Sequence, residues 1–320
     1  MNKLENKKKI LIISEKSDVH VKRVLSFIDK DKVDIDIIGM KILEDNGYFV
    51  EVNQQNTYLF KTKNKKNDYY DICWWRKPRY IEISEKFLKD PNLYHIVNSE
   101  KNNFFKSIIL NINIKKWVNN ISDIDKSNYK LLQLKLISEY NSDFLNVPKT
   151  IVTNNKNIIY KTFKKSFIMK SLNNQKLGIK NIGLKSTLTN IDNIKKINLN
   201  SCPVICQEFI DKAYEIRVTI IGKKIFAVKI FSHSEKSKID FRTDYKNLTY
   251  EACELSKEIK NILLKINKYY KLNYSAIDLI VDKDEKIYFL EINPNGQYLW
   301  IEDATNLSIS LEIAKFLENY

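Results

Sequence analysis

The chain has 320 residues, of which 43% are hydrophobic and 29% charged, with a formal net charge of +15 and a sequence pI near 9.3. This composition excludes an intrinsically disordered chain and predicts a folded protein with more than one subdomain. No apolar run approaches the roughly 20 residues that span a bilayer, and residues 10–13 are too short for the apolar core of a signal peptide. We therefore expect a cytoplasmic protein without a membrane partner.

The net charge and the cysteine content indicate which partners and which kinds of site to expect. The positive charge favours an acidic partner, although lysine, isoleucine and asparagine are abundant throughout, as an AT-rich coding sequence would produce. The lysines form no nucleic-acid-binding motif, so nucleic acid is the less favoured partner. The four cysteines and three histidines have no metal-ligand spacing and no Ser-His-Asp grouping. We expect reduced cysteines that pack as small hydrophobic side chains.

The N-terminal part of the chain has the pattern of an α/β domain. Residues 10–13 predict a buried strand, residues 17–29 a helix and residues 33–38 a second strand. This βαβ opening lacks the Gly-x-Gly-x-x-Gly sequence of a dinucleotide site. Residues 69–76 (YYDICWWR) predict a later strand that leads into a basic turn, and a domain border is expected near residues 98–101.

The middle of the chain predicts a helix, two strands and a polar loop. Ser127 is the expected N-cap of a helix over residues 128–140. Residues 167–170 (FIMK) predict a strand that ends in a lysine, and residues 203–210 predict another strand. Residues 171–185 predict a polar loop that holds two of the six glycines but does not match a P-loop.

The C-terminal part predicts an α+β layout of antiparallel strands and helices. Residues 214–221 and 224–231 predict a hairpin, because Gly222 permits a tight turn between them. Helices are expected over residues 251–270 and 309–317.

A second hairpin near the end of the chain carries the strongest candidate site. Residues 274–281 (YSAIDLIV) predict an apolar strand with one carboxylate, and residues 286–293 return as the second arm. Glu291 and Asn293 share a face because side chains alternate along a strand, and Asp278 falls close to Glu291 across the ladder. Three oxygen ligands on one face predict a site for Mg²⁺, with Mn²⁺ as an alternative ion. The competing interpretation is a paired core aspartate beside a surface glutamate.

The order of these motifs resembles the ATP-grasp ligase superfamily from residue 127 to the C-terminus, with residues 9–98 as the pre-grasp domain. The resemblance is closest to the peptide-maturing ligases that make microviridin-type graspetides, including the grasp-with-spasm branch. The strings that carry it are WWR at residues 74–76, KLLQLK at 130–135, YEIRVT at 214–219, LEINPNGQ at 290–297 and WIE at 300–302. Phe241, between Asp240 and Arg242, is closer to the second branch, whereas residues 295–297 are closer to the first, so the subfamily stays open.

The resemblance implies an α/β pre-grasp domain (residues 1–98) followed by two α+β lobes that clasp ATP (residues 99–205 and 206–320). The residues that it implies for nucleotide binding are Lys130, Lys170, Gln207, Glu208, Phe209, Ile210 and Glu215. The residues that match magnesium ligands are Asp278, Glu291 and Asn293, and the arginines expected to stabilise a transferring phosphoryl group are Arg217 and Arg242. Lys161 competes with Lys170 as the second phosphate lysine. The alternative for Arg217 is an ion pair with Asp240 or Glu215.

The implied reaction is ATP-dependent ligation through an acyl phosphate, with release of ADP. In a graspetide ligase the reacting carboxylate and its nucleophile, a hydroxyl or an amine, belong to an acidic precursor peptide with a leader and a core. The products are macrocycles closed by ester or amide bonds. The alternatives are an ATP-grasp ligase that joins amino acids to a small molecule or a protein terminus, and a non-catalytic nucleic-acid-binding protein. A homodimer is compatible with the sequence.

Overall fold

The computed structural model describes residues 7–43, 49–51, 54, 59–61, 69–78, 90–140, 142–172, 176–177, 182–183, 186–199 and 202–319. The chain divides into two compact units, each of which is described by itself. The first unit comprises Met1–Ile124, Lys271–Tyr274 and Ser308–Tyr320, and the second comprises Asp125–Tyr270 and Ser275–Leu307. Among the described residues, no helix is both long enough and apolar enough to cross a membrane.

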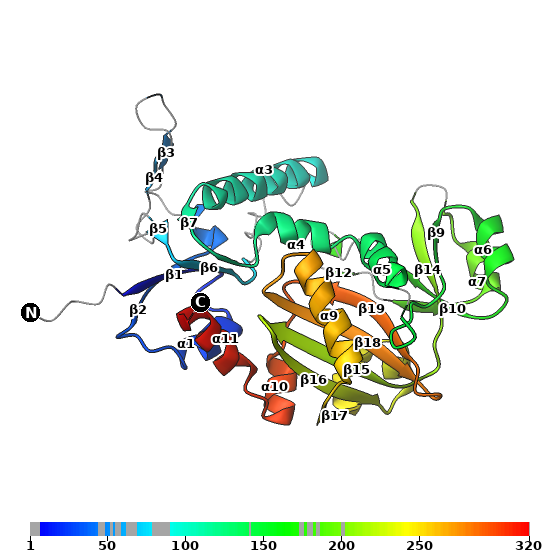
Figure 1. Cartoon of the computed structure of the whole chain (residues 1–320). Helices are drawn as coiled ribbons and strands as arrows, with labels where there is room; N and C mark the ends of the chain where they lie inside the picture. Colours follow the sequence, from blue (N-terminus) through cyan, green and yellow to red (C-terminus); the bar gives the residue numbers. More distant parts are fainter. Residues whose placement is uncertain are drawn as a thin grey trace, which may run out of the picture. The chain divides into compact units, whose positions relative to one another are not determined.

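The first unit is built on a parallel sheet with the strand order β2-β1-β6-β8. The strands of this unit are β1 (Lys8–Ile13), β2 (Val33–Ile38), β3 (Phe49–Glu51), β4 (Leu59–Lys61), β5 (Tyr69–Tyr70), β6 (Ile72–Trp75), β7 (Asn113–Ile114) and β8 (Trp117–Val118). The helices are α1 (Val19–Leu25), η1 (Met40–Leu43), α3 (Pro91–Leu110), the start of α4 (Ile121–Ser127) and α11 (Ile309–Asn319). Figure 1 labels most of these elements along the chain. The parallel order confirms the α/β layout expected for this part of the sequence.

Helix α3 supplies much of the apolar cover of this sheet. Leu11 and Trp75 from the sheet belong to one buried cluster with Phe105 and Ile109 of α3. The Trp75 and Phe105 rings lie 6.1 Å apart between centroids. Because α3 runs without a break through residues 98–101, the border expected there falls inside a helix, and the first unit continues to Ile124.

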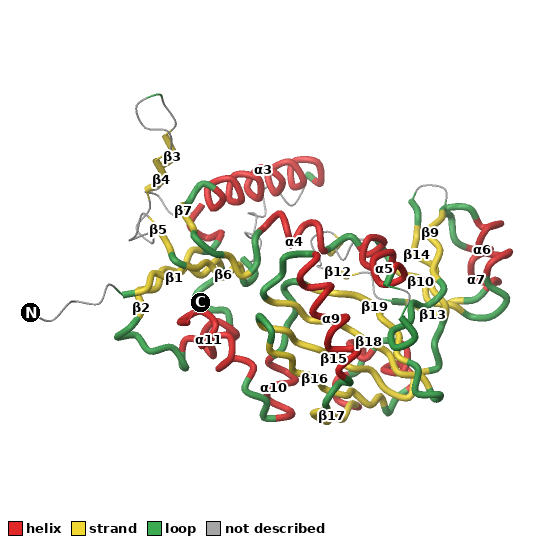
Figure 2. Tube along the Cα trace, viewed as in Figure 1, coloured by secondary structure: helices red, strands yellow, loops and turns green. Residues whose placement is uncertain are grey.

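Among its described residues, the second unit contains two large antiparallel sheets and the short antiparallel pair β11-β12. Its strands are β9 (Thr150–Thr153), β10 (Phe167–Lys170), β11 (Lys176–Leu177), β12 (Ile182–Gly183), β13 (Thr187–Thr189), β14 (Val204–Glu208), β15 (Lys212–Ile221), β16 (Lys224–Ser232), β17 (Leu248–Cys253), β18 (Tyr274–Asp282) and β19 (Ile287–Asn293). Its helices are α5 (Lys130–Glu139), α6 (Lys156–Thr162), α7 (Ile191–Lys196), α8 (Glu235–Ile239), η2 (Phe241–Thr243), η3 (Tyr245–Asn247), α9 (Lys257–Tyr269) and α10 (Leu299–Thr305). Figure 2 separates these helices and strands by colour.

Each large sheet of the second unit has one face in an apolar core. In the smaller sheet, β13-β10-β14-β9, Phe167 and Cys206 pack against Ile159 of α6 and Ile194 of α7. The larger sheet has the order β17-β16-β15-β18-β19, and Figure 1 shows α9 across one of its faces. Side-chain alternation turns the neighbouring residues, such as Ile168, toward the other face. These second faces hold the candidate site.

Both predicted hairpins are present in the larger sheet. Ile221 pairs with Lys224 across the first turn, where Gly222 has a φ of 57°, in the left-handed region that glycine adopts without strain. The second hairpin joins β18 to β19 and places Asp278 directly opposite Glu291. The cross-strand neighbours expected from the sequence are therefore confirmed.

Three local predictions were wrong. Ser127 ends α4 instead of capping α5, whose N-cap is Tyr129 without a side-chain hydrogen bond. Residues 251–253 belong to β17 because they pair with β16, and α9 begins only after Ser256, whose side chain accepts the Ile259 N–H. The expected loop over residues 171–185 contains the short antiparallel pair β11 and β12.

Candidate active site

A cavity of about 330 Å³ lies in the second unit. Its lining takes side chains from β10 and β14 of the smaller sheet, on the face opposite to α6 and α7, and from β15, β18 and β19 of the larger sheet. The sequence-predicted site residues in this lining are Lys130, Lys170, Gln207, Glu208, Phe209, Ile210, Glu215, Arg242, Asp278 and Glu291. Among the residues that the structure describes, the lining does not include Arg217, Asn293 or Lys161.

A β-bulge on β19 shapes the face that carries Glu291. Asp278 pairs with Glu291, but the next residue, Leu279, pairs with Phe289, so Leu290 is an extra residue in the ladder. The bulge lets Phe289 and Ile292 both point into the core, with 0% and 2% exposure, although they are three residues apart. Leu290 and Glu291 both line the cavity as a result.

Asp278 and Glu291 form a pair of like charges in a buried setting. Burial alone would raise the pKa of Glu291, but Lys130, Arg242 and Lys170 outweigh burial and hold that pKa below its usual value. For Asp278, burial and the Glu291 carboxylate raise the pKa despite the neighbouring Arg217. A divalent cation would relieve this repulsion, and two hard carboxylate oxygens suit Mg²⁺.

The two candidate phosphate lysines reach this carboxylate pair from different elements. Lys130, the first residue of α5, places its Nζ 3.7 Å from Glu291 Oε2 and donates to the Ser171 carbonyl at 3.3 Å. Lys170, the last residue of β10, is half-buried, and desolvation lowers the pKa of its ammonium to about 8. Lys161 is exposed on α6, so the structure favours Lys170 in this competition.

Gln207, expected among the nucleotide-binding residues, lines the cavity, and its side chain bonds to two protein groups. Lys170 Nζ donates to Gln207 Oε1 at 2.6 Å, and Gln207 Nε2 donates to Thr150 Oγ1 at 2.9 Å. The amide therefore holds the lysine in place. Glu208, the next residue, is exposed and accepts the Lys149 N–H at 3.3 Å.

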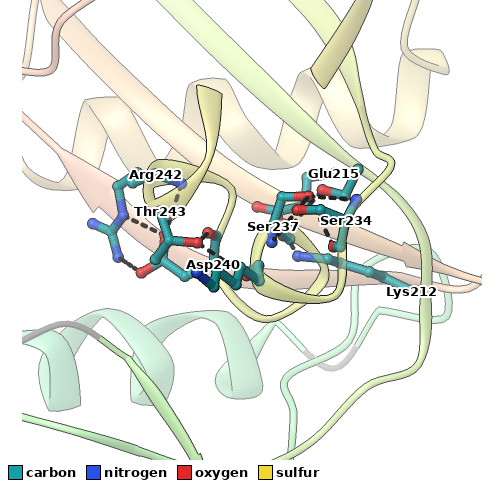
Figure 3. A network of polar contacts seen from close by, with 9 residues as sticks. Lys212, Glu215, Ser234, Ser237, Asp240, Arg242 and Thr243 are labelled. Carbon is teal, nitrogen blue, oxygen red and sulfur yellow. Dashed lines mark hydrogen bonds and ion pairs between the residues drawn. The ribbon is translucent and has the colours of Figure 1, made fainter. Parts of the chain in front are cut away.

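Glu215 is paired within the cavity. It forms an ion pair with Lys212, which lies three residues earlier on β15, and both side chains are buried. Burial raises the pKa of Glu215, and the charge of Lys212 opposes that rise. Figure 3 shows Lys212 and Glu215 beside Ser234 and Ser237. Lys212 was not predicted from the sequence, although it lies two residues after Ile210, the last of the expected nucleotide-binding residues around β14.

Arg217 lies behind the carboxylate pair and not in the lining. Its Nη1 donates to Asp278 Oδ1 at 2.6 Å and its Nη2 to the Gln297 carbonyl at 3.1 Å. The ion pair is with Asp278, so the expected alternatives, Asp240 and Glu215, were wrong as partners. A guanidinium in this position supports a carboxylate of the pair, and its contact with a transferring phosphoryl group stays a prediction.

Arg242 lines the cavity from a turn that aromatic residues anchor. The Arg242 side chain is 47% exposed and forms an ion pair with Asp240 through two hydrogen bonds of 2.8 Å, as Figure 3 shows. Phe241 packs with Ile230 and with Trp300, whose ring centroid is 5.6 Å away. The buried ring thus fixes the arginine on the cavity side of the turn.

The third expected metal ligand, Asn293, is on the predicted face opposite Ala276. Its Oδ1 accepts the Asn295 N–H at 2.9 Å, which closes the turn after β19. Within the described part of the chain, no three His, Cys, Asp or Glu side chains gather closely enough to hold a metal ion by themselves. That Asn293 is a metal ligand stays a prediction, and the two carboxylates are the residues that support a metal site.

The lining also contains residues that the sequence did not predict, among them Lys212, Lys238, Ser171 and Ser186. Among the described residues, the lining holds five basic and five acidic side chains. A ligand with several negative charges would upset this balance unless a cation accompanied it. The cavity therefore suits an anion together with its metal ion.

A model of the RimK-like ATP-grasp domain matches residues 125–317, which is more than half of the chain. The chain belongs to the RimK-like ATP-grasp family. The match covers all the cavity residues of this ATP-grasp protein. The family binds ATP with Mg²⁺.

Solved structures match this ATP-grasp protein along nearly its whole length. One is the macrocyclase MdnC of Microcystis aeruginosa MRC bound with the precursor peptide MdnA, at 25% identity and a TM-score of 0.81, over 98% of this chain and 100% of that one. Another is a RiPP-associated ATP-grasp ligase of Chryseobacterium gregarium in complex with ADP and a leader and core peptide, at 26% identity and a TM-score of 0.81, over 97% and 96% of the two chains. The ligase PsnB, complexed with a precursor variant, Mg and ADP, shares the fold at 17% identity and a TM-score of 0.74, over 98% of each chain.

A curated relative covers less of the chain. An uncharacterized protein of Mycoplasma genitalium is 31% identical over 114 residues, which are 35% of this chain and 38% of that protein. The match thus spans well under half of the relative.

Proposed function

We propose that this protein is an ATP-dependent ligase that crosslinks side chains of an acidic precursor peptide through ester or amide bonds. The observation that carries the proposal is the cavity in which Lys130 and Lys170 accompany the Asp278–Glu291 pair. Peptide complexes of MdnC and of the Chryseobacterium ligase, which share this fold over nearly the whole chain, support a peptide substrate.

The cavity lining suggests how a nucleotide would be held. Apolar side chains such as Ile168, Phe209 and Ile210 suit an adenine ring, and the backbone of residues 208–210 could meet its polar edge. Lys130 and Lys170 suit the phosphates, since ammonium groups bind phosphate oxygens through charge-assisted hydrogen bonds. Glu215 could accept the ribose hydroxyls, but this contact would compete with its ion pair to Lys212.

Asp278 and Glu291 would hold Mg²⁺, with Mn²⁺ as an alternative, and the ion would supply charge neutralisation at the transferring phosphoryl group. Arg217 would keep the Asp278 carboxylate oriented and ionised. Asn293 would complete the ligand set only after its side-chain oxygen leaves the Asn295 N–H.

In the first step, a peptide carboxylate oxygen attacks the γ-phosphorus of ATP, the bond to the bridging oxygen breaks, and ADP leaves with the electron pair. In the second step, a hydroxyl or amine of the peptide attacks the acyl carbon and loses its proton, and inorganic phosphate leaves. Lys130, Lys170 and the half-exposed Arg242 would stabilise the charge that develops in these steps. The positions of these groups would replace a covalent nucleophile.

The test is to incubate the protein with ATP, Mg²⁺ and an acidic peptide that carries clustered Thr or Ser and Glu or Asp residues. Each crosslink should remove one water from the peptide mass and release one ADP and one phosphate. A peptide whose mass rises by whole amino-acid residues would instead support the amino-acid ligase. Nucleic-acid binding without ADP release would support the non-catalytic alternative.

The variant Glu291→Ala should lower the ligation rate by at least about a hundredfold, because metal-mediated charge stabilisation is worth several kcal/mol. The matched control is Glu251→Ala, which removes an exposed carboxylate from β17 of the same unit. Full ligation by Glu291→Ala would show that the metal assignment is wrong.

A further inference from the structure

β19 is the outer strand of its sheet, so its outward backbone groups need partners other than a strand. At one end Asn146 supplies them: its N–H donates to the Ile287 carbonyl and its carbonyl accepts the Phe289 N–H, both at 2.8 Å. The next outward groups belong to Ile292. In a regular strand they would lie two residues after Phe289, but the extra residue Leu290 makes the spacing three.

Gln133 supplies the partner at this second point. Its Oε1 accepts the Ile292 N–H at 3.0 Å, and its Nε2 donates to the Ile292 carbonyl at 3.0 Å. The same Nε2 donates to the Ser127 carbonyl at 2.6 Å, and the residue is 2% exposed. One primary amide thus pairs with both backbone groups of a residue, as a neighbouring strand would. Glutamine has the donor, the acceptor and the length for this contact.

The contact lies one helical turn from Lys130 on α5 and one residue from Glu291 on β19. Lys130 precedes Gln133 by three residues on α5, so the two side chains share a helix face. Glu291 precedes Ile292 on β19. Two adjacent contacts, Lys130 to Glu291 at 3.7 Å and Gln133 to Ile292 at 3.0 Å, therefore join the same helix to the same strand.

We infer that Gln133 is a positioning residue, which fixes the spacing between Lys130 and Glu291 and so sets the affinity of the cavity for metal-bound ATP. The inference rests on the proposed function and deepens it, because it assigns the nucleotide geometry to a residue outside the cavity lining. We expect a large effect because Gln133 holds Ile292, which lies beside the bulge where the register of strand pairing shifts.

The experiment measures the Kd of Mg·ATP by calorimetry, without a peptide, for the full chain and its variants. Gln133→Met keeps the side-chain size and removes all three hydrogen bonds. It should raise the Kd about tenfold or more, as the loss of a group that orients ligating residues does. Gln133→Glu keeps the acceptor for the Ile292 N–H but loses the donors, and it should also weaken binding.

The matched control is Asn119→Leu in the first unit. Asn119 is 1% exposed and also makes three such bonds, donating to the Tyr274 carbonyl at 2.8 Å and accepting the N–H groups of Asn273 at 2.8 Å and Tyr274 at 3.0 Å. Its loss should lower the thermal stability but change the Kd by less than about twofold.

A folded Gln133→Met protein with the wild-type Kd would overturn the inference, and so would an equal loss of affinity in Asn119→Leu. If Gln133→Met does not fold, the Kd of Gln133→Glu tests the inference instead, and a wild-type Kd would overturn it. A wild-type protein that binds no Mg·ATP would instead overturn the proposed function, and the inference with it.

Discussion

Gly296 marks the closest approach between the turn after β19 and the strand beside it. A Cβ atom at Gly296 would lie 2.3 Å from Ala276 Cβ and 2.7 Å from Arg217 Nη2. Real Cβ atoms do not come this close to other atoms, so Gly296→Ala must displace at least one neighbour. Ala276 is fully buried on β18, and hydrogen bonds to Asp278 and Gln297 hold the Arg217 guanidinium.

The cost of Gly296→Ala can be estimated from these contacts. Overpacking a well-filled core costs about 1–3 kcal/mol, and two fixed neighbours place this substitution near 3 kcal/mol. For a domain of this size, each 1 kcal/mol lowers Tm by roughly 2–4 °C, so the expected fall is about 6–12 °C. Removal of the Ala276 methyl in Gly296→Ala/Ala276→Gly should recover about half of this loss, because the contact with Arg217 remains.

Thermal unfolding followed by circular dichroism checks this prediction. The matched control is Gly39→Ala, whose Cβ would first meet the flexible end of the Glu15 side chain, at 2.5 Å. That carboxylate can rotate away, so a cost below about 1 kcal/mol is expected. A Gly296→Ala protein as stable as the wild type, or one that Ala276→Gly does not rescue, would refute the reasoning.

Two further variants test the charges of the site. Arg217→Met leaves the Asp278 carboxylate without its guanidinium partner and should lower the free energy of unfolding, measured in urea, by about 3–5 kcal/mol. The double variant Arg217→Met/Asp278→Leu should recover most of that loss. Equal stability of the single and the double variant would contradict the ion pair. The Lys170 ammonium has a pKa lowered to about 8, so it carries its charge below that pH and loses it above; kcat/KM for ATP should fall as pH rises through about 8. In Lys170→Arg the side chain stays charged, so the remaining kcat/KM should not fall as pH rises through about 8. A variant whose kcat/KM falls with pH as the wild type's does would show that another group titrates.

The second hairpin could be predicted from sequence because its evidence is local. The apolar run around Asp278 and the turn before residue 286 specify two paired arms, and alternation assigns the faces. The same reasoning found Lys170 at the end of a strand. It could not give the partner of Arg217, since Asp278 is 61 residues away and the pairing depends on how β15 lies beside β18.

Other features could not be predicted from the sequence because tertiary contacts determine them. Residues 251–253 were expected in a helix, but hydrogen bonds to β16 make them a strand. α3 was missed because its run of polar residues, with asparagines at 98, 102 and 103, weakens the helical period. Gln133 stood in one of the recognised strings, yet its contact with Ile292 bridges 159 residues and leaves no local signal.

The bulge at Leu290 decides on which side of the sheet the chemistry takes place. Up to Phe289 the strand follows one alternation, and from Glu291 onward it follows the opposite one. If the same residues formed a strand without the bulge, regular alternation from Phe289 would turn Glu291 toward the apolar core and Ile292 toward the cavity. Deletion of Leu290 would remove the bulge and leave both side chains on their present faces, so relatives with a one-residue gap here can still build the carboxylate pair, whereas relatives of the same length need the bulge.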